Sequence, residues 1–163
     1  MSALENTSVK RVRAALVAAG LDDRVMELAD TARSAQDAAA SIGTELGSIV
    51  KSLVFRVGER PVMALVAGDR QCREKHLKQV LDLPGKVRRA DADTVRAATG
   101  YAIGGVSPAG LPGELPVVVD ASLARFATVY AAAGHPHCVF PATFDELVAL
   151  SGGLVDDAIS HCP

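Results

Sequence analysis

Residues 49–55 read Ile-Val-Lys-Ser-Leu-Val-Phe, an apolar run with one lysine at its centre. The run is rich in β-branched and aromatic residues and lies between Gly47 and Gly58, which predicts a β-strand. Because strand side chains alternate between two faces, Lys51 is expected to share the more apolar face with the other odd-numbered residues. A buried ammonium group without a partner is costly, so Lys51 needs a carboxylate, a route to water or an anionic ligand.

The surrounding pattern alternates strands with helices. A turn signal over 57–61 and a second apolar run over 62–67 predict a β-hairpin that begins with the Lys51 strand. Further short strands are predicted at 25–28, 87–90, 117–119, 127–132 and 138–140. Helices are predicted after the N-cap residues Ser8, Ser34, Asp91 and Thr143, and between 73 and 81. This mixture, without a linker, predicts an α+β fold in a single domain over residues 1–163, with a mixed, mostly antiparallel sheet.

The composition limits the function classes. Aromatic residues make up only 4% of the chain and tryptophan is absent, so no aromatic platform for nucleic-acid bases is expected, and DNA is not an expected partner. The N-terminus lacks the apolar core of a signal peptide, and the apolar runs are too short for a membrane span. Three cysteines do not form a disulfide framework, which favours a reducing, cytoplasmic location.

The charge is unevenly distributed. Residues 70–89 contain seven bases and two acids, a local charge of +5, although the whole chain carries −2. One interpretation is an ordinary solvated helix and strand. The other is a small basic patch beside a site that receives one phosphorylated end.

Five short motifs occur in a recognisable order: the Lys51 strand, Gly68-Asp-Arg70, Thr99-Gly100-Tyr101, Gly104-Gly-Val-Ser-Pro108 and Phe126-Ala-Thr-Val-Tyr130. On these motifs the chain resembles the YbaK/prolyl-tRNA-editing superfamily of aminoacyl-tRNA deacylases. The resemblance implies an α+β fold around a mixed, barrel-like sheet with surrounding helices. It also implies hydrolysis of the ester that joins a wrong amino acid to the terminal adenosine of tRNA.

The resemblance also suggests roles for individual residues. Lys51 matches the lysine that holds the 3′ end of the substrate, and the loop over 104–108 matches the wall of the aminoacyl pocket. Gly104 and Gly105 allow a close backbone approach and could supply N–H donors to an oxyanion. The residues expected to contact the substrate are Ser107, Pro108, Asp69, Arg70, Ala132 and His137. No cofactor or metal is expected, and no residue stands out as a general base; in the family the vicinal hydroxyl of the tRNA is implicated as a helper.

Two departures bear on the substrate. The branch of the family that acts on Cys-tRNA has a serine where this chain has Ala132, and an aspartate near the position of Cys138. These differences argue against Cys-tRNA. They favour a small non-cognate residue on tRNA-Pro, with the tRNA acceptor end as partner and prolyl-tRNA synthetase as a possible second partner.

Simpler explanations remain for each motif. Lys51 could form a structural ion pair, and the loop over 104–108 could be an ordinary tight turn. His135, His137 and Cys138 could bind a metal, and Cys138 or Ser107 could act as a nucleophile, but their spacing supports none of these roles. Asp69 and Arg70 could simply close a strand-to-helix turn.

Three functions are therefore compared. The first is a trans-acting aminoacyl-tRNA deacylase. The second is a catalytically inactive tRNA- or synthetase-binding module of the same fold. The third is an enzyme acting on a small free metabolite, which would be active without tRNA.

Overall fold

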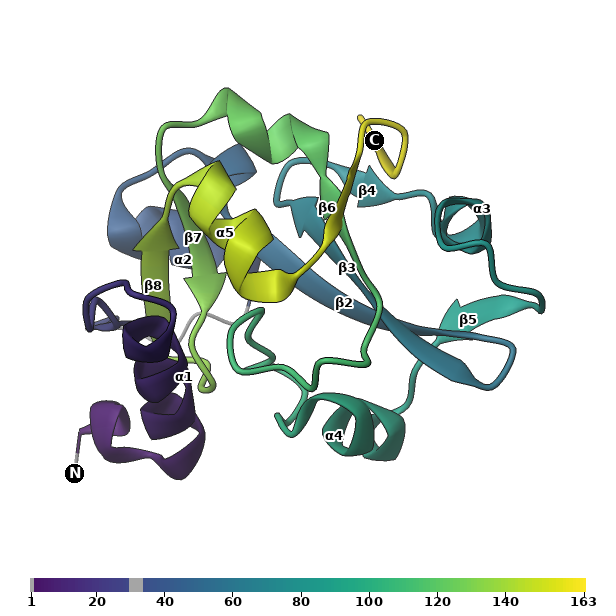
Figure 1. Cartoon of the computed structure of the whole chain (residues 1–163). Coiled ribbons are helices and arrows are strands. Elements are labelled where there is room, and N and C mark those ends of the chain that lie inside the picture. Colours follow the sequence, from purple (N-terminus) through teal and green to yellow (C-terminus); the bar gives the residue numbers. More distant parts are fainter. Residues whose placement is uncertain (1, 30–33) are drawn as a thin grey trace.

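The computed structural model describes residues 2–29 and 34–163 (Figure 1). The helices are α1 (Thr7–Ala18), α2 (Ala35–Ile42), α3 (Leu77–Val80), α4 (Ala92–Thr99) and α5 (Phe144–Ser151). Short 3-10 turns lie at Ala3–Glu5 (η1), Leu46–Ser48 (η2), Glu74–His76 (η3) and Ala121–Arg125 (η4). The strands are β1 (Met26–Glu27), β2 (Val50–Val57), β3 (Arg60–Ala67), β4 (Gln71–Cys72), β5 (Val87–Arg89), β6 (Val117–Asp120), β7 (Val129–Ala132), β8 (Cys138–Ala142), β9 (Leu154–Asp156) and β10 (Ser160–His161).

The strands form three sheets in the described part of the chain. The largest has the order β5-β2-β3-β6-β9, in which β2 pairs antiparallel with β3 and β5, whereas the β3–β6 and β6–β9 pairs are parallel. A second sheet has the order β1-β8-β7, and β10 pairs with β4. The predicted α+β class and the mostly antiparallel pairing are confirmed. The sheet is less closed than expected, because these strands form no closed barrel.

The predicted hairpin is confirmed and forms the centre of the molecule. All eight residues of β2 pair with β3, from Val50 with Ala67 to Val57 with Arg60. Both faces of β2 are covered, so the expected difference between an apolar and a polar face is small. Val54 faces the larger core, while Phe55 faces a second core that contains Leu77 of α3.

Local capping signals account for most helix boundaries. Ser34, Asp91 and Thr143 are N-caps as predicted, and the Thr143 cap is a full capping box with Glu146. The prediction for the first helix was wrong by two residues: the cap is Asn6, whose side chain accepts the Ser8 N–H. Asn6 can cap because its backbone is extended, whereas Ser8 already has helical geometry.

The segment predicted as helical over 73–81 divides into the turn η3 and the short helix α3. Strands β4, β9 and β10 were not predicted.

In the described part of the chain, no helix combines the length and the apolar character that crossing a bilayer requires.

Candidate functional site

A cavity of about 420 Å³ lies beside β2. Its walls come from β2, α2, α4, strands β7 and β8, and the loop that contains Gly104. Apolar side chains make up much of the wall, among them Val54, Val95 and Val106. The size and the largely apolar wall with a few polar groups are typical of small-molecule sites.

The cavity exists because β2 has no neighbouring strand along part of one side. β5 pairs only with residues 55–57, and at the other end a single parallel bridge joins Ile49 to Tyr130 of β7. Between these two contacts β5 and β7 diverge. We call residues 50–54 the open edge of β2.

The backbone of Ser52 points toward the cavity from this open edge. The carbonyl of Val54 accepts the Ala90 N–H on the β5 side, whereas the carbonyl of Ile49 accepts the Gly68 N–H on the β3 side. Since backbone groups alternate in direction along an antiparallel strand, the N–H and C=O of Ser52 share the side of Val54. The Ser52 hydroxyl oxygen is buried and has no hydrogen-bond partner among the described residues. A bound molecule could pair with the backbone N–H and C=O of Ser52 from this edge.

Lys51 also lines the cavity, and it is held by the backbone. Its Nζ donates a hydrogen bond of 2.5 Å to the main-chain carbonyl of Arg70. Within the described residues, no carboxylate lies at ion-pairing distance from Nζ, so the structure does not support the ion-pair alternative. An ammonium group has three donors, and Arg70 uses one of them.

Burial lowers the pKa of Lys51 below the usual range for lysine. The nearby Cys72, Asp69 and Asp120 oppose this effect, and Arg89 adds to it. Lowering by burial means that the folded protein destabilises the charged form. A ligand with negative charge, or with charge that develops during a reaction, would be favoured beside this group.

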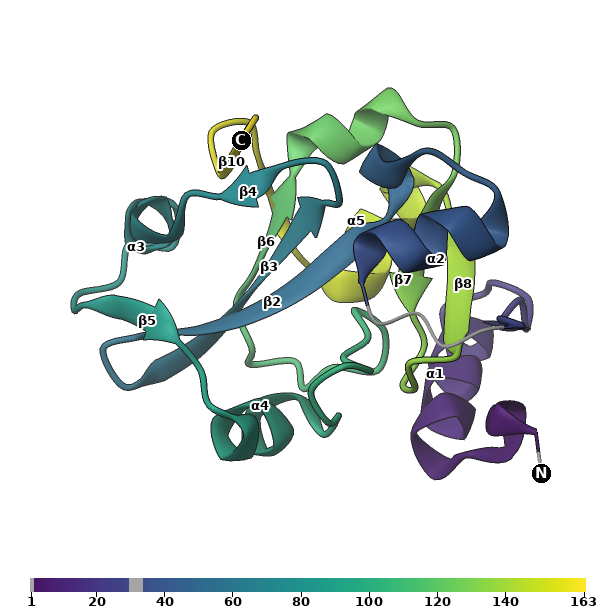
Figure 2. The same ribbon diagram turned by 180° about the vertical axis from the view of Figure 1, so that it is seen from behind.

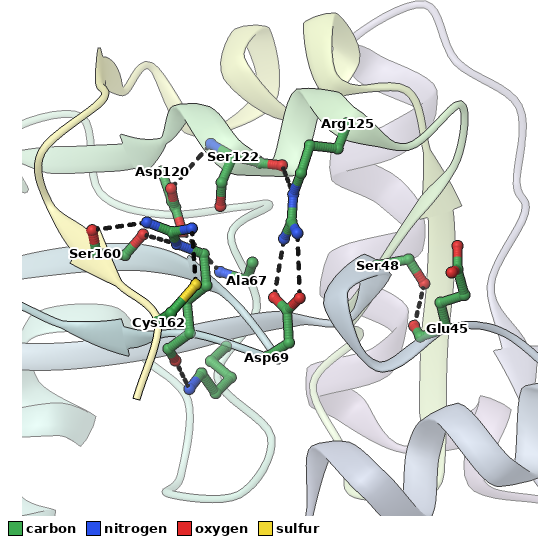
Figure 3. A network of polar contacts seen from close by, with 11 residues as sticks. Glu45, Ser48, Ala67, Asp69, Asp120, Ser122, Arg125, Ser160 and Cys162 are labelled. Carbon is green, nitrogen blue, oxygen red and sulfur yellow. Dashed lines mark hydrogen bonds and ion pairs between the residues drawn. The ribbon is translucent and has the colours of Figure 1, made fainter.

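The turn that contains Asp69 and Arg70 fixes Lys51 through the Arg70 carbonyl. The Asp69 carboxylate accepts two hydrogen bonds from the Arg125 guanidinium, of 2.8 and 3.1 Å (Figure 3). The Arg70 guanidinium donates to the hydroxyl and to the carbonyl of Ser160 in β10, at 2.8 and 3.0 Å. Neither residue lines the cavity, so their predicted contact with substrate stays a prediction. What the structure shows is that they hold the turn whose carbonyl binds Lys51.

Asp120 stabilises the same region from within the protein. Its side chain is 1% exposed and accepts the backbone N–H groups of Ala67 and Ser122, at 3.1 and 2.9 Å. Both donors belong to segments that lead into the site. The buried carboxylate therefore ties the end of β3 to η4 (Figure 3).

Replacing Asp120 by alanine is expected to lower the free energy of unfolding by about 2–3 kcal/mol, because two N–H groups lose their acceptor inside the protein. Urea unfolding followed by circular dichroism measures this change. The matched control is Asp157→Ala, an exposed aspartate near β10, which should change stability by about 0.5 kcal/mol or less. Equal effects for the two variants would show that the buried contacts of Asp120 contribute little.

The loop over 104–108 borders the cavity at Gly104 and Val106 and packs into the protein with its other residues. Gly104 has a positive φ of 95°. The Gly105 N–H already donates to the carbonyl of Ala102, so of the two predicted oxyanion donors Gly104 is the better placed. Ser107 and Pro108 are buried, and the Ser107 hydroxyl accepts the Ala109 N–H. The predicted contact of Ser107 and Pro108 with substrate stays a prediction.

The neighbouring part of the wall comes from β7 and the segment before β8. Ala132 and Tyr130 line the cavity together, as expected for alternate residues of one strand. His135 also lines it, whereas His137 does not. The His137 N–H donates to Nδ1 of His135 at 3.0 Å, so the predicted residue orients the one that reaches the cavity.

The cysteines near the site are protonated at neutral pH. Burial raises the pKa of Cys138 and of Cys72 to about 11. A thiol with this pKa is a poor nucleophile, which supports the prediction that Cys138 is a packing residue. In the described residues, no group of three or more histidine, cysteine or acidic side chains could hold a metal ion.

Residues 29–150 match the model of the aminoacyl-tRNA editing domain. The chain is 34% identical to the uncharacterised protein YwhH of Bacillus subtilis, over 88% of this chain and 91% of that protein. It is 37% identical to proline–tRNA ligase of Solidesulfovibrio magneticus over 55% of this chain, which is only 15% of the ligase.

Solved structures of similar proteins have the same fold. A crystal structure described as a candidate trans-editing enzyme for prolyl tRNA synthetase superposes with a TM-score of 0.85 at 38% identity, covering 93% of this chain and 96% of that one. The protein APE2540, described as hypothetical, superposes with a TM-score of 0.81 at 30% identity, covering 93% of this chain and 99% of that one.

Proposed function

Because the chain belongs to the aminoacyl-tRNA editing domain family, we propose that it is a free-standing deacylase that removes a small non-cognate amino acid from tRNA-Pro. The observation that carries this proposal is the cavity on the open edge of β2, with Lys51 at its border. Its apolar wall suits a small side chain, and the cationic border suits the ester and the 3′ end of the tRNA.

In the proposed reaction, water attacks the carbonyl carbon of the ester and the bond from that carbon to the ribose oxygen breaks. The ribose oxygen takes a proton, which leaves a free amino acid and a tRNA with an intact terminal hydroxyl. Negative charge develops on the carbonyl oxygen in the transition state. Lys51 and the backbone at Gly104 are the groups proposed to stabilise it.

Among the described residues, no carboxylate lines the cavity. Both oxygens of the Asp69 carboxylate accept hydrogen bonds from Arg125. This agrees with the family-based expectation that the vicinal hydroxyl of the tRNA helps the water. It is also the observation that favours the second candidate, a module that binds aminoacylated tRNA without hydrolysing it.

The deciding experiment charges tRNA-Pro separately with alanine, cysteine, serine and proline, and follows the loss of each ester. Selective loss of a small non-cognate residue supports the deacylase. Binding of the charged tRNA without loss of any ester supports the inactive module. Hydrolysis at a comparable rate of a simple amino-acid ester that lacks the adenosine, such as a methyl ester, would instead favour an enzyme for small metabolites.

Ala132 is expected to set the upper size limit of the amino acid, because its methyl group lies in the wall of the cavity. An Ala132→Leu variant should lower kcat/KM about tenfold or more for the preferred substrate, since added methylene groups occupy the space of its side chain. The measurement is single-turnover hydrolysis with alanyl- and seryl-tRNA-Pro. Ala133→Gly, at the next and fully buried position, is a control for general loosening of β7. An unchanged rate for Ala132→Leu would place the amino acid elsewhere in the cavity.

A further inference from the structure

Exposed bases are concentrated at one end of the molecule. In the described chain, six exposed lysines and arginines between residues 73 and 89 have no carboxylate at ion-pairing distance. They are Arg73, Lys75, Lys78, Lys86, Arg88 and Arg89. Elsewhere several bases are neutralised locally, as for Lys10 with Glu5 and Arg13 with Asp23.

Four of these bases belong to one surface, which we call the basic surface: Arg73, Lys75, Lys78 and Arg89. η3 and α3 cover the Phe55 side of β2, because Leu77 of α3 is buried in the core that contains Phe55. Arg89 lies on the same side, with its guanidinium 5.4 Å from the centre of the Phe55 ring. Lys75 and Lys78 are exposed and three residues apart on the continuous turn formed by η3 and α3. Both ribbon views place α3 beside β5 (Figures 1 and 2).

The basic surface is continuous with the cavity. Arg89 lines the cavity, and its charge contributes to the lowered pKa of Lys51. The two acids of this stretch, Glu74 and Asp82, leave most of the positive charge uncompensated. Since the chain as a whole carries −2, a partner attracted to this surface is not attracted by the protein in general.

We propose that the basic surface binds the phosphates of the acceptor strand of tRNA as its 3′ end enters the cavity. The inference rests on the proposed function, and it names the part of the protein that recognises the partner. Arg89 is the residue of the basic surface that lines the cavity, so nucleotides that precede an adenosine held at Lys51 can reach this surface past Arg89. Lysines on η3 and α3 then meet the phosphates as point charges, independently of base sequence. The surface therefore supplies affinity for tRNA, whereas the cavity supplies discrimination between amino acids.

The test compares two substrates: full-length aminoacyl-tRNA and the aminoacyl ester of adenosine, which lacks the acceptor strand. The variant Lys75→Glu/Lys78→Glu should lower kcat/KM for the tRNA about tenfold or more, mainly through KM, and leave the adenosine ester unchanged. The dependence of log KM on log salt concentration should become shallower by roughly 0.7–0.9 for each phosphate that the variant no longer neutralises. Lys10→Glu is the control for charge reversal at an exposed helical lysine away from the basic surface: Lys10 belongs to α1, at the other end of the molecule, and is already paired with Glu5.

The outcomes separate the inference from the proposed function. The inference is overturned if the double variant loses activity equally on both substrates, or if it loses no activity on the tRNA. In either case, hydrolysis by the unmodified protein still supports the deacylase. If the unmodified protein hydrolyses neither substrate, the deacylase fails. The basic surface is then tested by fluorescence anisotropy with labelled tRNA, where unchanged binding by the double variant overturns it.

Discussion

Lys51→Met is expected to lower the rate of ester hydrolysis about 100-fold or more, the loss typical of removing one group that stabilises an oxyanion. Methionine keeps much of the length and apolar character of lysine but removes the charge and the donors. The loss should appear in kcat, because the charge on the carbonyl oxygen is greatest in the transition state.

The same variant is expected to keep its fold. Burial lowers the pKa of Lys51, which means that the charged form is less favourable in the folded than in the unfolded protein at neutral pH. Removing the charge relieves this cost, while losing the hydrogen bond to Arg70 opposes the gain. We therefore expect a melting temperature within a few degrees of the original by calorimetry.

Two further variants test the interpretation of Lys51. Lys51→Arg keeps the charge but cannot place it at the same point, and it should recover only a small part of the activity. Lys75→Met removes an exposed lysine outside the cavity and should leave hydrolysis of the adenosine ester unchanged. Full activity of Lys51→Met would refute a catalytic role for the lysine.

Gly105→Ala is expected to damage both activity and stability. A Cβ at this position would lie 2.8 Å from the carbonyl carbon and 2.9 Å from the carbonyl oxygen of Gly134, and 2.9 Å from the nitrogen of His135. These are backbone atoms, so the two loops that border the cavity have to separate. We expect a loss of about 1–3 kcal/mol in the free energy of unfolding from overpacking. A shift of about 1 Å in the positioned groups would lower kcat/KM about 100-fold.

Gly113→Ala is the matched control. A Cβ at Gly113 meets nothing within 4 Å, and its backbone lies outside the left-handed region. Urea unfolding and single-turnover hydrolysis are measured for both variants. If Gly105→Ala behaved like Gly113→Ala, the contact between the two loops would not shape the site.

The sequence predicted those parts of the fold that depend on neighbouring residues. The Lys51 hairpin and the caps at Ser34, Asp91 and Thr143 carry local signals, and all are present. Strands β4 and β10 have two residues each, too few for a periodic pattern, and they form because they pair with one another across the fold.

The site was only partly predictable for a similar reason. Lys51, Gly104 and Ala132 line the cavity as expected. The Arg70 guanidinium donates a hydrogen bond to Ser160, which is 90 positions away in the sequence, and no local sequence pattern predicts this contact. His135 rather than His137 reaches the cavity, and both histidines lie in the turn before β8, where the alternation of strand side chains does not apply.

Ser52 was overlooked as a site residue, although one polar residue among apolar neighbours was a usable signal. Its importance depends on the missing neighbour of β2, which is a property of the sheet. The Tyr130 side chain could have been found from Ala132, because the two are alternate residues of one strand.

The open edge of β2 has a consequence for self-association. An unpaired strand edge normally invites another chain to add a strand, which leads to aggregation. Here the edge lies within a cavity whose walls include α2 and the Gly104 loop, which limits the approach of another polypeptide strand. A terminal aminoacyl group is small enough to enter. The same cavity therefore limits both strand pairing between copies of the protein and the binding of bulky ligands. A variant whose cavity is widened to accept larger amino acids is expected to aggregate more readily.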